Sequence, residues 1–252
     1  MNAGIGRSPP ARRSGLARAL SKLGICSRSR ASEMIREGRV RVNGALRRNP
    51  EFPVDLTRDR IDLDREPVFA QEKIYVMLNK PRGQVTTTSD EQGRPTVFAA
   101  LDSQGLPHVN PVGRLDKASE GLLIFTNDTL WAARITAPSS HFEKTYHVQI
   151  NVLANDSLLE RLRSGLKVDE DFLSVKRATV LRSGEKNCWL ELVLDEGRNR
   201  HIRRLLAALD ISVLRLVRVA VGPLQLGNLA KGQFRFLTEA EVETLRRGPV
   251  VG

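Results

Sequence analysis

The chain has 252 residues, with 40 lysines and arginines against 29 acidic residues and a formal net charge of +11. This length suits one large core or two domains of unequal size, and the excess positive charge predicts a polyanionic partner. The two cysteines, Cys26 and Cys188, are far apart in sequence and form no CxxC pair, which argues against a disulfide framework or a zinc site.

The composition also argues against a membrane or secreted protein. No apolar run approaches the roughly 20 residues that cross a bilayer. The N-terminus lacks the apolar core of a signal peptide. We therefore expect a cytoplasmic protein with no membrane partner.

Positive charge is concentrated at the N-terminus. Residues 1–48 carry twelve lysines and arginines and only two acidic residues, so this segment accounts for +10 of the net charge. No amphipathic helix with an exposed aromatic face accompanies the charge, which favours nucleic acid over anionic lipid as the partner. Residues 1–13 resemble a flexible basic tail.

Two helices and a hairpin are predicted next. Apolar spacing predicts a helix over 16–23, and Gly24 ends it. Ser27 is a candidate N-cap for a second helix that stops at Gly38. Residues 39–42 alternate as in a strand, and the pair Asn43-Gly44 predicts a hairpin turn. A closing strand is expected at 60–64 and a linker at 65–67.

The remainder predicts an α+β body built on a large mixed, mainly antiparallel sheet with flanking helices. Strands are expected at 74–78, 122–126, 144–152, 190–194, 213–221 and 234–237. Helical periodicity covers 129–137, 156–165, 202–209 and 239–246.

The carboxylate of Asp116 stands on a loop bounded by glycines. The loop covers residues 113–121, with Asp116 at its centre, and the apolar run 122–126 follows it. A carboxylate held at the end of a rigid strand is placed to attack or activate a substrate. The alternative is that Asp116 only caps a turn or a short helix.

Arginines gather in a second segment. Four of the seven residues from Arg198 to Arg204 are arginines, between a predicted strand and a predicted helix. Free N–H groups at a helix start, surrounded by guanidinium groups, can hold a phosphate or a carboxylate. The alternative is a solvated basic face. Tyr146, near the start of strand 144–152, is most simply a packing residue, and we assign no chemistry to the strand exit 78–83.

Together these segments resemble the pseudouridine synthases. The string 113–128 is similar to that family's signature loop, and 78–83, 142–148 and 196–204 resemble its other motifs. Residues 14–62, which contain Gly-Arg-Val-Arg-Val-Asn-Gly, resemble the S4 RNA-binding domain. The resemblance implies an S4-like domain at 14–65 after the tail 1–13, and a catalytic domain at 70–248.

The resemblance also implies roles for single residues. In the family the aspartate of the loop is the essential catalytic residue, which corresponds to Asp116. The tyrosine of the Lys-x-Tyr motif stacks on the target base, which implies Tyr146. The arginine after the glycine of the last motif pairs with the aspartate, which implies Arg198. Arg114 would fill the gap left by the flipped base or hold the displaced backbone. His201 stands where most relatives have glutamine.

Contacts with RNA are expected from basic residues of both domains. The expected RNA-binding residues are Arg114, Lys144, Arg200, Arg203 and Arg204 in the body, and Lys22, Arg28, Arg30, Arg36, Arg39, Arg41 and Asn43 in the N-terminal domain. The implied partner is ribosomal RNA or a pre-ribosomal particle, bound by a monomer. The expected reaction involves no redox step and no phosphoryl transfer, so we expect no metal and no organic cofactor.

The implied activity is isomerisation of a specific uridine of ribosomal RNA to pseudouridine. The pattern is most similar to the type B enzymes of the large subunit, with small-subunit RNA as the alternative. A non-catalytic S4 protein acting in ribosome assembly would leave Asp116, Tyr146 and Arg198 without a role. An S4-containing RNA methyltransferase would need a glycine-rich cofactor loop such as GxGxxG, which is absent from the sequence. A DNA glycosylase-like hydrolase would share the attack on C1′ but not these motifs.

Overall fold

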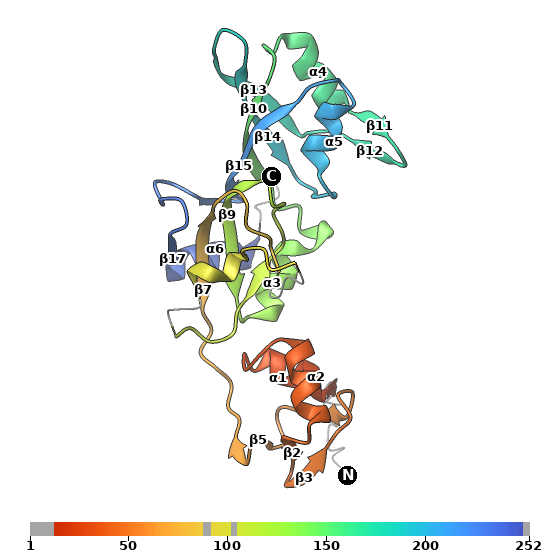
Figure 1. Ribbon diagram of the computed structural model, residues 1–252, viewed down its shortest axis with the longest axis vertical. Helices are drawn as coiled ribbons and strands as arrows, with labels where there is room; N and C mark the ends of the chain where they lie inside the picture. The colour runs from red at the N-terminus through yellow and green to blue at the C-terminus, as the bar shows by residue number, and fades with distance from the viewer. Residues whose placement is uncertain (1–12, 88–91, 102–104, 249–252) are drawn as a thin grey trace, which may run out of the picture. The chain divides into compact units, whose positions relative to one another are not determined.

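The computed structural model describes residues 13–87, 92–101 and 105–248 (Figure 1). The chain divides into two compact units: the first runs up to Lys73 and includes Pro107–Val109, and the second contains the rest of the chain from Ile74. Each unit is described by itself. Except for Arg13, the expected basic tail lies outside the described residues.

The N-terminal unit packs two helices on small sheets, as expected from the sequence. Its helices are α1 (Leu16–Lys22) and α2 (Arg28–Arg36). A four-stranded sheet has the order β3-β2-β5-β6, with β2 Val40–Val42, β3 Ala45–Arg47, β5 Ile61–Leu63 and β6 Glu66–Pro67; β1 (Ser14–Gly15) pairs with β4 (Pro53–Val54). The Ser27 hydroxyl accepts the Arg30 N–H at 3.2 Å, which confirms the N-cap. Asn43 and Gly44 both have positive φ, which confirms the hairpin turn.

The linker expected at 65–67 is wrong. Asp64 and Arg65 adopt φ of 52° and 74°, which turns the chain back on itself. Glu66 and Pro67 then pair with Leu63 and Asp62 as an edge strand. Proline is tolerated at a sheet edge, where its missing N–H costs no ladder bond. Residues 68–74 carry no helix or strand and make the connection instead.

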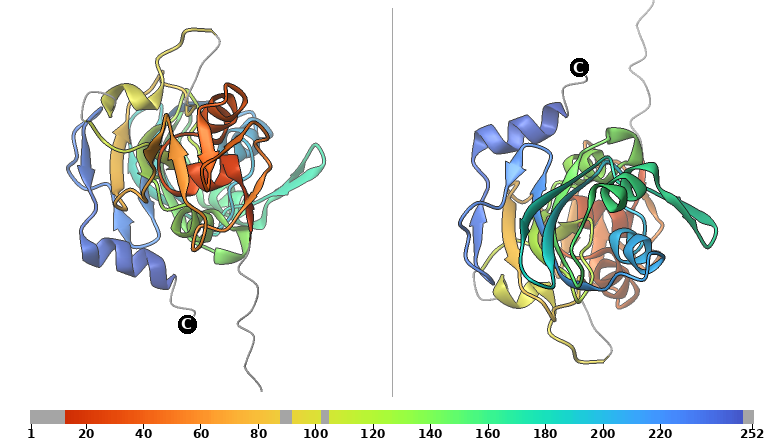
Figure 2. Two further views of the ribbon diagram at one scale, coloured as in Figure 1. Left: turned by 90° about the horizontal axis from the view of Figure 1, so that it is seen from below. Right: turned by 90° about the horizontal axis from the view of Figure 1, so that it is seen from above.

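The C-terminal unit is an α+β body, as expected. Its nine-stranded sheet has the order β13-β14-β10-β15-β9-β7-β17, with β16 on β15 and β8 on β9; only β15 and β9 are parallel. The strands are β7 Tyr75–Lys80, β8 Asn110–Val112, β9 Glu120–Thr126, β10 Lys144–Ile150, β13 Arg177–Ser183, β14 Cys188–Leu194, β15 Val213–Val221, β16 Leu224–Gln225 and β17 Phe234–Phe236. A separate hairpin of β11 (Leu166–Val168) and β12 (Asp171–Leu173) projects from the body (Figure 2).

Helices cover the sheet in two groups, each with its own core. The helices are α3 Thr129–Thr136, α4 Asp156–Ser164, α5 His201–Ala207 and α6 Glu239–Arg247, and short 3-10 turns occupy Val97–Ala100 and Pro138–Ser140. One core packs α4 and α5 against β10, β14 and β15. The other packs α3 and α6 around β7 and β9. No helix among the described residues is long and apolar enough to span a bilayer.

A glycine permits the one parallel contact of the sheet. Gly121, with φ of +101°, lies opposite Arg218 where β9 meets β15. A Cβ atom at position 121 would lie 2.2 Å from the Arg218 carbonyl oxygen. Only glycine fits this approach, which places the loop carrying Asp116 beside β15.

Candidate active site

The loop that precedes β9 borders a cavity of about 590 Å³ in the C-terminal unit. Asp116 lines this cavity from the loop, and Tyr146 lines it from β10. The segment before α5 and the first residues of α5 also line the cavity, as does Arg218 of β15. The fold therefore brings the two segments singled out in the sequence to one site.

Hydrogen bonds hold the main chain of the Asp116 loop. Every carbonyl from Leu115 to Ser119 accepts at least one. The donors are the Thr86 hydroxyl to Leu115 (2.8 Å), Lys80 Nζ to Asp116 (3.2 Å) and Ser119 (2.8 Å), the Gly83 N–H to Lys117 (2.8 Å) and Arg203 Nη2 to Ala118 (3.1 Å). The Asp116 carboxylate is half-buried and makes no hydrogen bond or ion pair with any residue in the described part of the chain. The loop is thus fixed while its carboxylate stays available.

Lys80 is the main support of this loop, and the sequence reading assigned it no chemistry. Its side chain is completely buried at the end of β7. The ammonium also donates to the Pro81 carbonyl at 3.1 Å. Burial lowers the pKa of Lys80 to about 8, although the charges of Asp116 and Glu120 favour its cationic form. In the sequence, the available signal for this role was a lysine at the end of an apolar run.

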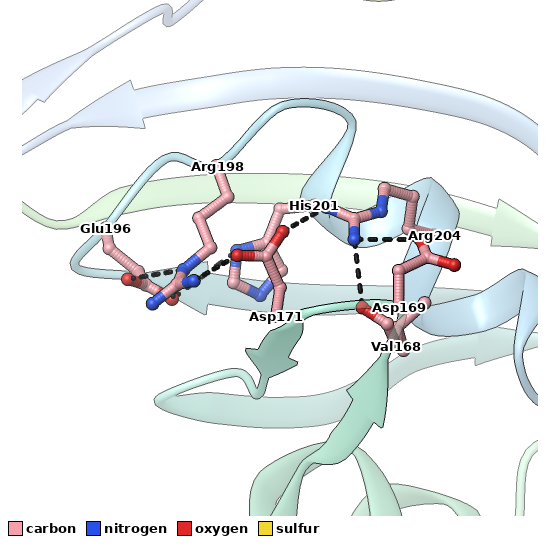
Figure 3. Close-up of polar contacts among 7 residues, drawn as sticks. All are labelled: Val168, Asp169, Asp171, Glu196, Arg198, His201 and Arg204. Carbon is pink, nitrogen blue, oxygen red and sulfur yellow. Dashed lines mark hydrogen bonds and ion pairs between the residues drawn. The ribbon is translucent and has the colours of Figure 1, made fainter.

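The structure does not bring Arg198 to Asp116. Its Nη1 donates to the Asp171 carboxylate, and its Nε donates to Glu196 at 3.2 Å (Figure 3). The side chain lies at the cavity wall and is 42% exposed. The pairing implied by the resemblance is therefore corrected: the described contacts of Arg198 are with Asp171 and Glu196.

Arg203, and not Arg198, contacts the loop that carries Asp116. Its guanidinium is half-buried in the cavity wall and donates to the Ala118 carbonyl, two residues from Asp116. Burial lowers the pKa of Arg203, and the nearby Asp116 charge opposes that shift. Its Nε is buried with no hydrogen-bond partner in the described part of the structure. Arg203 thus lies next to the Asp116 loop and retains an unused donor.

Three further side chains line the cavity. Tyr146 is half-buried and packs against the core of α4 and α5. Lys144 lies two residues earlier, and burial, followed by the charge of Arg218, lowers its pKa. Arg218 is only 6% exposed and donates its Nε to the Leu122 carbonyl at 2.8 Å. Arg218 was missed, because one arginine within an alternating strand looks like a solvent-facing residue.

The other expected RNA-binding residues of the C-terminal unit differ in their positions relative to the cavity. Arg114 is exposed at the rim of the cavity. Arg200 also borders the cavity, with φ of 50° immediately before α5. Arg204 does not line it; this side chain bonds the β11–β12 hairpin through Asp171 at 2.7 Å and Val168 at 3.0 Å.

In the N-terminal unit the structure separates exposed from engaged candidates. Arg28, Arg30 and Arg36 are exposed on α2, where Arg30 also pairs with Glu33 at 3.1 Å, and Lys22 is half-buried. Arg39 is held by the Asp64 carboxylate through two bonds of 2.9 and 2.6 Å. Asn43 donates to Asp59 at 2.9 Å, and Arg41 donates to the Gly44 carbonyl at 2.9 Å. Arg28 and Arg36 of α2 are thus the best placed for phosphates.

Positive charge dominates the cavity. Lys144, Arg203 and Arg218 line the cavity together with Asp116, and the buried ammonium of Lys80 holds the loop that carries Asp116. Such a set suits a polyanionic ligand and offsets the charge of a buried carboxylate. The described residues contain no group of three or more His, Cys, Asp or Glu placed to hold a metal ion.

His201 occupies a closed position at the start of α5. Its Nε2 lies 2.9 Å from the Ser174 carbonyl, so the neutral ring donates there. Its Nδ1 is buried without a hydrogen bond in the described structure and lies 3.7 Å from Glu196 Oε1. Burial lowers the pKa of His201 below its usual value, although the hydrogen bond to Ser174 and the charge of Glu196 oppose this shift.

A pH effect on stability follows. Because the folded-state pKa is lowered, the unfolded chain binds the extra proton first as pH falls below about 6.5. The free energy of unfolding should therefore decrease between pH 7.5 and 5.5. His201→Gln, which keeps a donor for Ser174, should show a smaller decrease in urea unfolding. His147→Gln, a half-exposed histidine beside Glu191, is the matched control. Equal losses in wild type and His201→Gln would contradict this prediction.

Comparison with known proteins agrees with this geometry. The family described as RNA pseudouridylate synthase matches residues 74–208. The S4 domain matches residues 15–61. The first match contains the Asp116 loop, Tyr146 and the segment 196–204, and the second covers most of the basic N-terminal unit.

Relatives that align over about nine tenths of this chain are named as pseudouridine synthases. An RNA pseudouridine synthase of Aquifex aeolicus is 36% identical over 90% of this chain and 91% of its own length. The ribosomal large subunit pseudouridine synthase B of Bacillus subtilis is 33% identical over 92% and 95%. A crystal structure of a pseudouridylate synthase is similar with a TM-score of 0.65 and 29% identity, covering 92% of this chain and 99% of that one. The chain belongs to the RNA pseudouridine synthase family, and combines an S4 domain with the isomerase domain of that family.

Proposed function

We propose that this chain isomerises a uridine of large-subunit ribosomal RNA to pseudouridine, with Asp116 as the catalytic residue. The observation that carries the proposal is the Asp116 loop itself. Its five successive carbonyls are hydrogen-bonded, and its half-buried carboxylate faces a cavity lined by cations. A nucleophile or anionic stabiliser needs this combination of a rigid backbone and an unengaged carboxylate.

The chemistry breaks the N1–C1′ glycosidic bond of uridine, turns the uracil and rejoins it through C5. C5 loses a proton and N1 gains one, so the product is an isomer and no co-reactant is consumed. A carboxylate close to the sugar and the ring can attack or stabilise the intermediate. The reacting base must leave the stack to reach the cavity.

Roles for the other residues follow from their positions. Tyr146, on the cavity wall, would stack on the flipped base. Arg203 would keep the Asp116 loop in place and balance its charge, the role expected of Arg198. Arg114, exposed at the rim, would hold the displaced RNA backbone or fill the space left by the base. We propose that no metal and no organic cofactor takes part.

Support for large-subunit RNA comes from one relative. The ribosomal large subunit pseudouridine synthase B of Bacillus subtilis is 33% identical to this chain and aligns over 92% of it. Small-subunit RNA remains the alternative target. We also propose that the enzyme is a monomer and acts in the cytoplasm, where ribosomal RNA would be its substrate.

Mapping pseudouridines in ribosomal RNA with and without this gene tests the proposal. Carbodiimide labelling should show one uridine of the large-subunit RNA that is modified only when the gene is present. Purified wild-type protein should restore the modification without a change in RNA mass. A modified small-subunit position would identify the alternative target. If neither RNA loses a pseudouridine without the gene and the protein still binds RNA, the result would support a non-catalytic S4 protein acting in ribosome assembly.

The α2 arginines should contribute affinity and not chemistry. The double variant Arg28→Ala/Arg36→Ala removes two exposed charges of the N-terminal unit. Each lost phosphate contact should flatten the slope of log affinity against log salt by about 0.7 to 0.9. Turnover at saturating RNA should remain near wild type.

Arg246→Ala on α6, an exposed arginine paired with Glu243, is the matched control for this variant. Its salt slope should equal that of the wild-type protein. An unchanged slope for the α2 double variant would show that these arginines do not contact the RNA backbone.

A further inference from the structure

One carboxylate outside the cavity holds two arginines of the segment that forms the cavity wall. Asp171 opens β12 of the projecting hairpin (Figure 3). One of its oxygens accepts from Arg198 Nη1 and the other accepts from Arg204 Nη1 at 2.7 Å. Arg198 belongs to the loop before α5 and Arg204 to the helix itself. A single side chain therefore ties both parts of this segment to the hairpin.

Additional bonds complete the attachment. Arg204 Nη2 donates to the Val168 carbonyl at 3.0 Å and to Asp169 Oδ2 at 3.1 Å. His201 contacts the Ser174 carbonyl, immediately after β12, at 2.9 Å. The first turn of α5 is thus bonded to the turn of the hairpin and to its far end.

The same turn of α5 supports the Asp116 loop from the other direction. Arg203, adjacent to Arg204, reaches the Ala118 carbonyl at 3.1 Å. The segment 196–204 therefore lies between two anchors, the hairpin on one side and the Asp116 loop on the other. Arg203 and Arg204, adjacent in sequence, therefore connect the two anchors.

We propose that Asp171 is a positioning residue for the reaction, because its carboxylate fixes segment 196–204 through Arg198 and Arg204 and thereby places Arg203 beside the Asp116 loop. The proposal rests on the proposed function. Asp171 does not line the cavity, so it acts through the two arginines and not on the substrate.

The hairpin does not need this carboxylate to form. Its strands pair over three residue pairs from Leu166↔Leu173 to Val168↔Asp171. Leu173 is fully buried in the core shared with α4 and α5. The ion-paired side chains are 34%, 42% and 23% exposed for Asp171, Arg198 and Arg204. Pairs this exposed contribute little to stability, so loss of Asp171 should change geometry more than folding.

Asp171→Asn tests this role. Its single-turnover rate at saturating RNA should fall about 100-fold, the cost of a small misplacement of catalytic groups. Its RNA affinity and melting temperature should stay close to those of the wild-type protein. Asp171→Glu, which restores a carboxylate on a longer side chain, should recover part of the rate. Glu170→Gln, the exposed neighbour in the turn, is the matched control and should react like wild type.

A second readout is independent of activity. Hydrogen exchange of the amides in 196–204 should be faster in Asp171→Asn than in wild type and Glu170→Gln. A wild-type rate in Asp171→Asn, or a lower rate with unaltered exchange, would overturn the positioning role. If the wild-type enzyme forms no pseudouridine, the proposed function fails, and unaltered exchange in Asp171→Asn would separately overturn the anchoring by Asp171.

Discussion

Asp116→Asn is expected to abolish pseudouridine formation while leaving folding and RNA binding nearly intact. An amide has almost the same shape as the carboxylate, but it can neither act as nucleophile nor stabilise positive charge. The loop is held through its main-chain carbonyls and not through the Asp116 side chain, so the substitution removes none of its anchors. The measurement is the single-turnover rate at saturating RNA, which separates chemistry from binding.

Asp210→Asn is the control for this variant. Asp210 is exposed, lies outside the cavity lining and has a φ of 59°, which asparagine also tolerates. Its rate should equal that of the wild-type enzyme. More than a few per cent of wild-type activity in Asp116→Asn, with an unchanged melting temperature, would refute the catalytic assignment.

Local signals explain why the N-terminal unit could be predicted from the sequence. The Ser27 cap and the Asn43-Gly44 turn act over three or four residues, so they need no knowledge of distant contacts. The buried strands of the body were also found, because β7 and β9 are continuous apolar runs. These two kinds of signal give the α+β class and most element positions.

Elements that lack such signals were missed. Strand β13 at the sheet edge has a single buried residue, Ala178, so its sequence shows no alternation. The β11–β12 hairpin is three residues long in each strand, below the length at which periodicity is visible. Pro67 indicated a linker, whereas the left-handed turn at Asp64 and Arg65 makes it an edge strand.

The functional site, too, could be predicted only in part from the sequence. The loop of Asp116 is a contiguous string, and its position in the fold follows from the apolar strand behind it. Which arginine contacts that loop depends on where α5 begins, because Arg198 lies before the helix and Arg203 lies within it. Asp171 is 27 residues from Arg198 in sequence, and only the folded hairpin brings the two together.

Arg203→Ala is expected to lose activity by orders of magnitude, and by more than Arg198→Ala. Arg203 donates to the Ala118 carbonyl in the half-buried wall of the cavity. A hydrogen bond from a charged donor typically contributes about 1.5–3 kcal/mol. A loss of roughly 3 kcal/mol in transition-state stabilisation corresponds to more than 100-fold in rate. Arg203→Lys should recover part of the rate, since it keeps the charge but loses the planar fork.

Arg198→Ala should have a smaller effect, because its described partners are the part-exposed carboxylates of Asp171 and Glu196, and Arg204 still holds Asp171. Arg200→Ala, an exposed position at the same cavity wall, should mainly weaken RNA binding. Single-turnover rates at saturating RNA compare the three alanine variants without the contribution of affinity. A larger loss in Arg198→Ala than in Arg203→Ala would show that Arg198 leaves Asp171 and pairs with Asp116 when RNA is bound. The Arg203 contact with the loop would then be only structural.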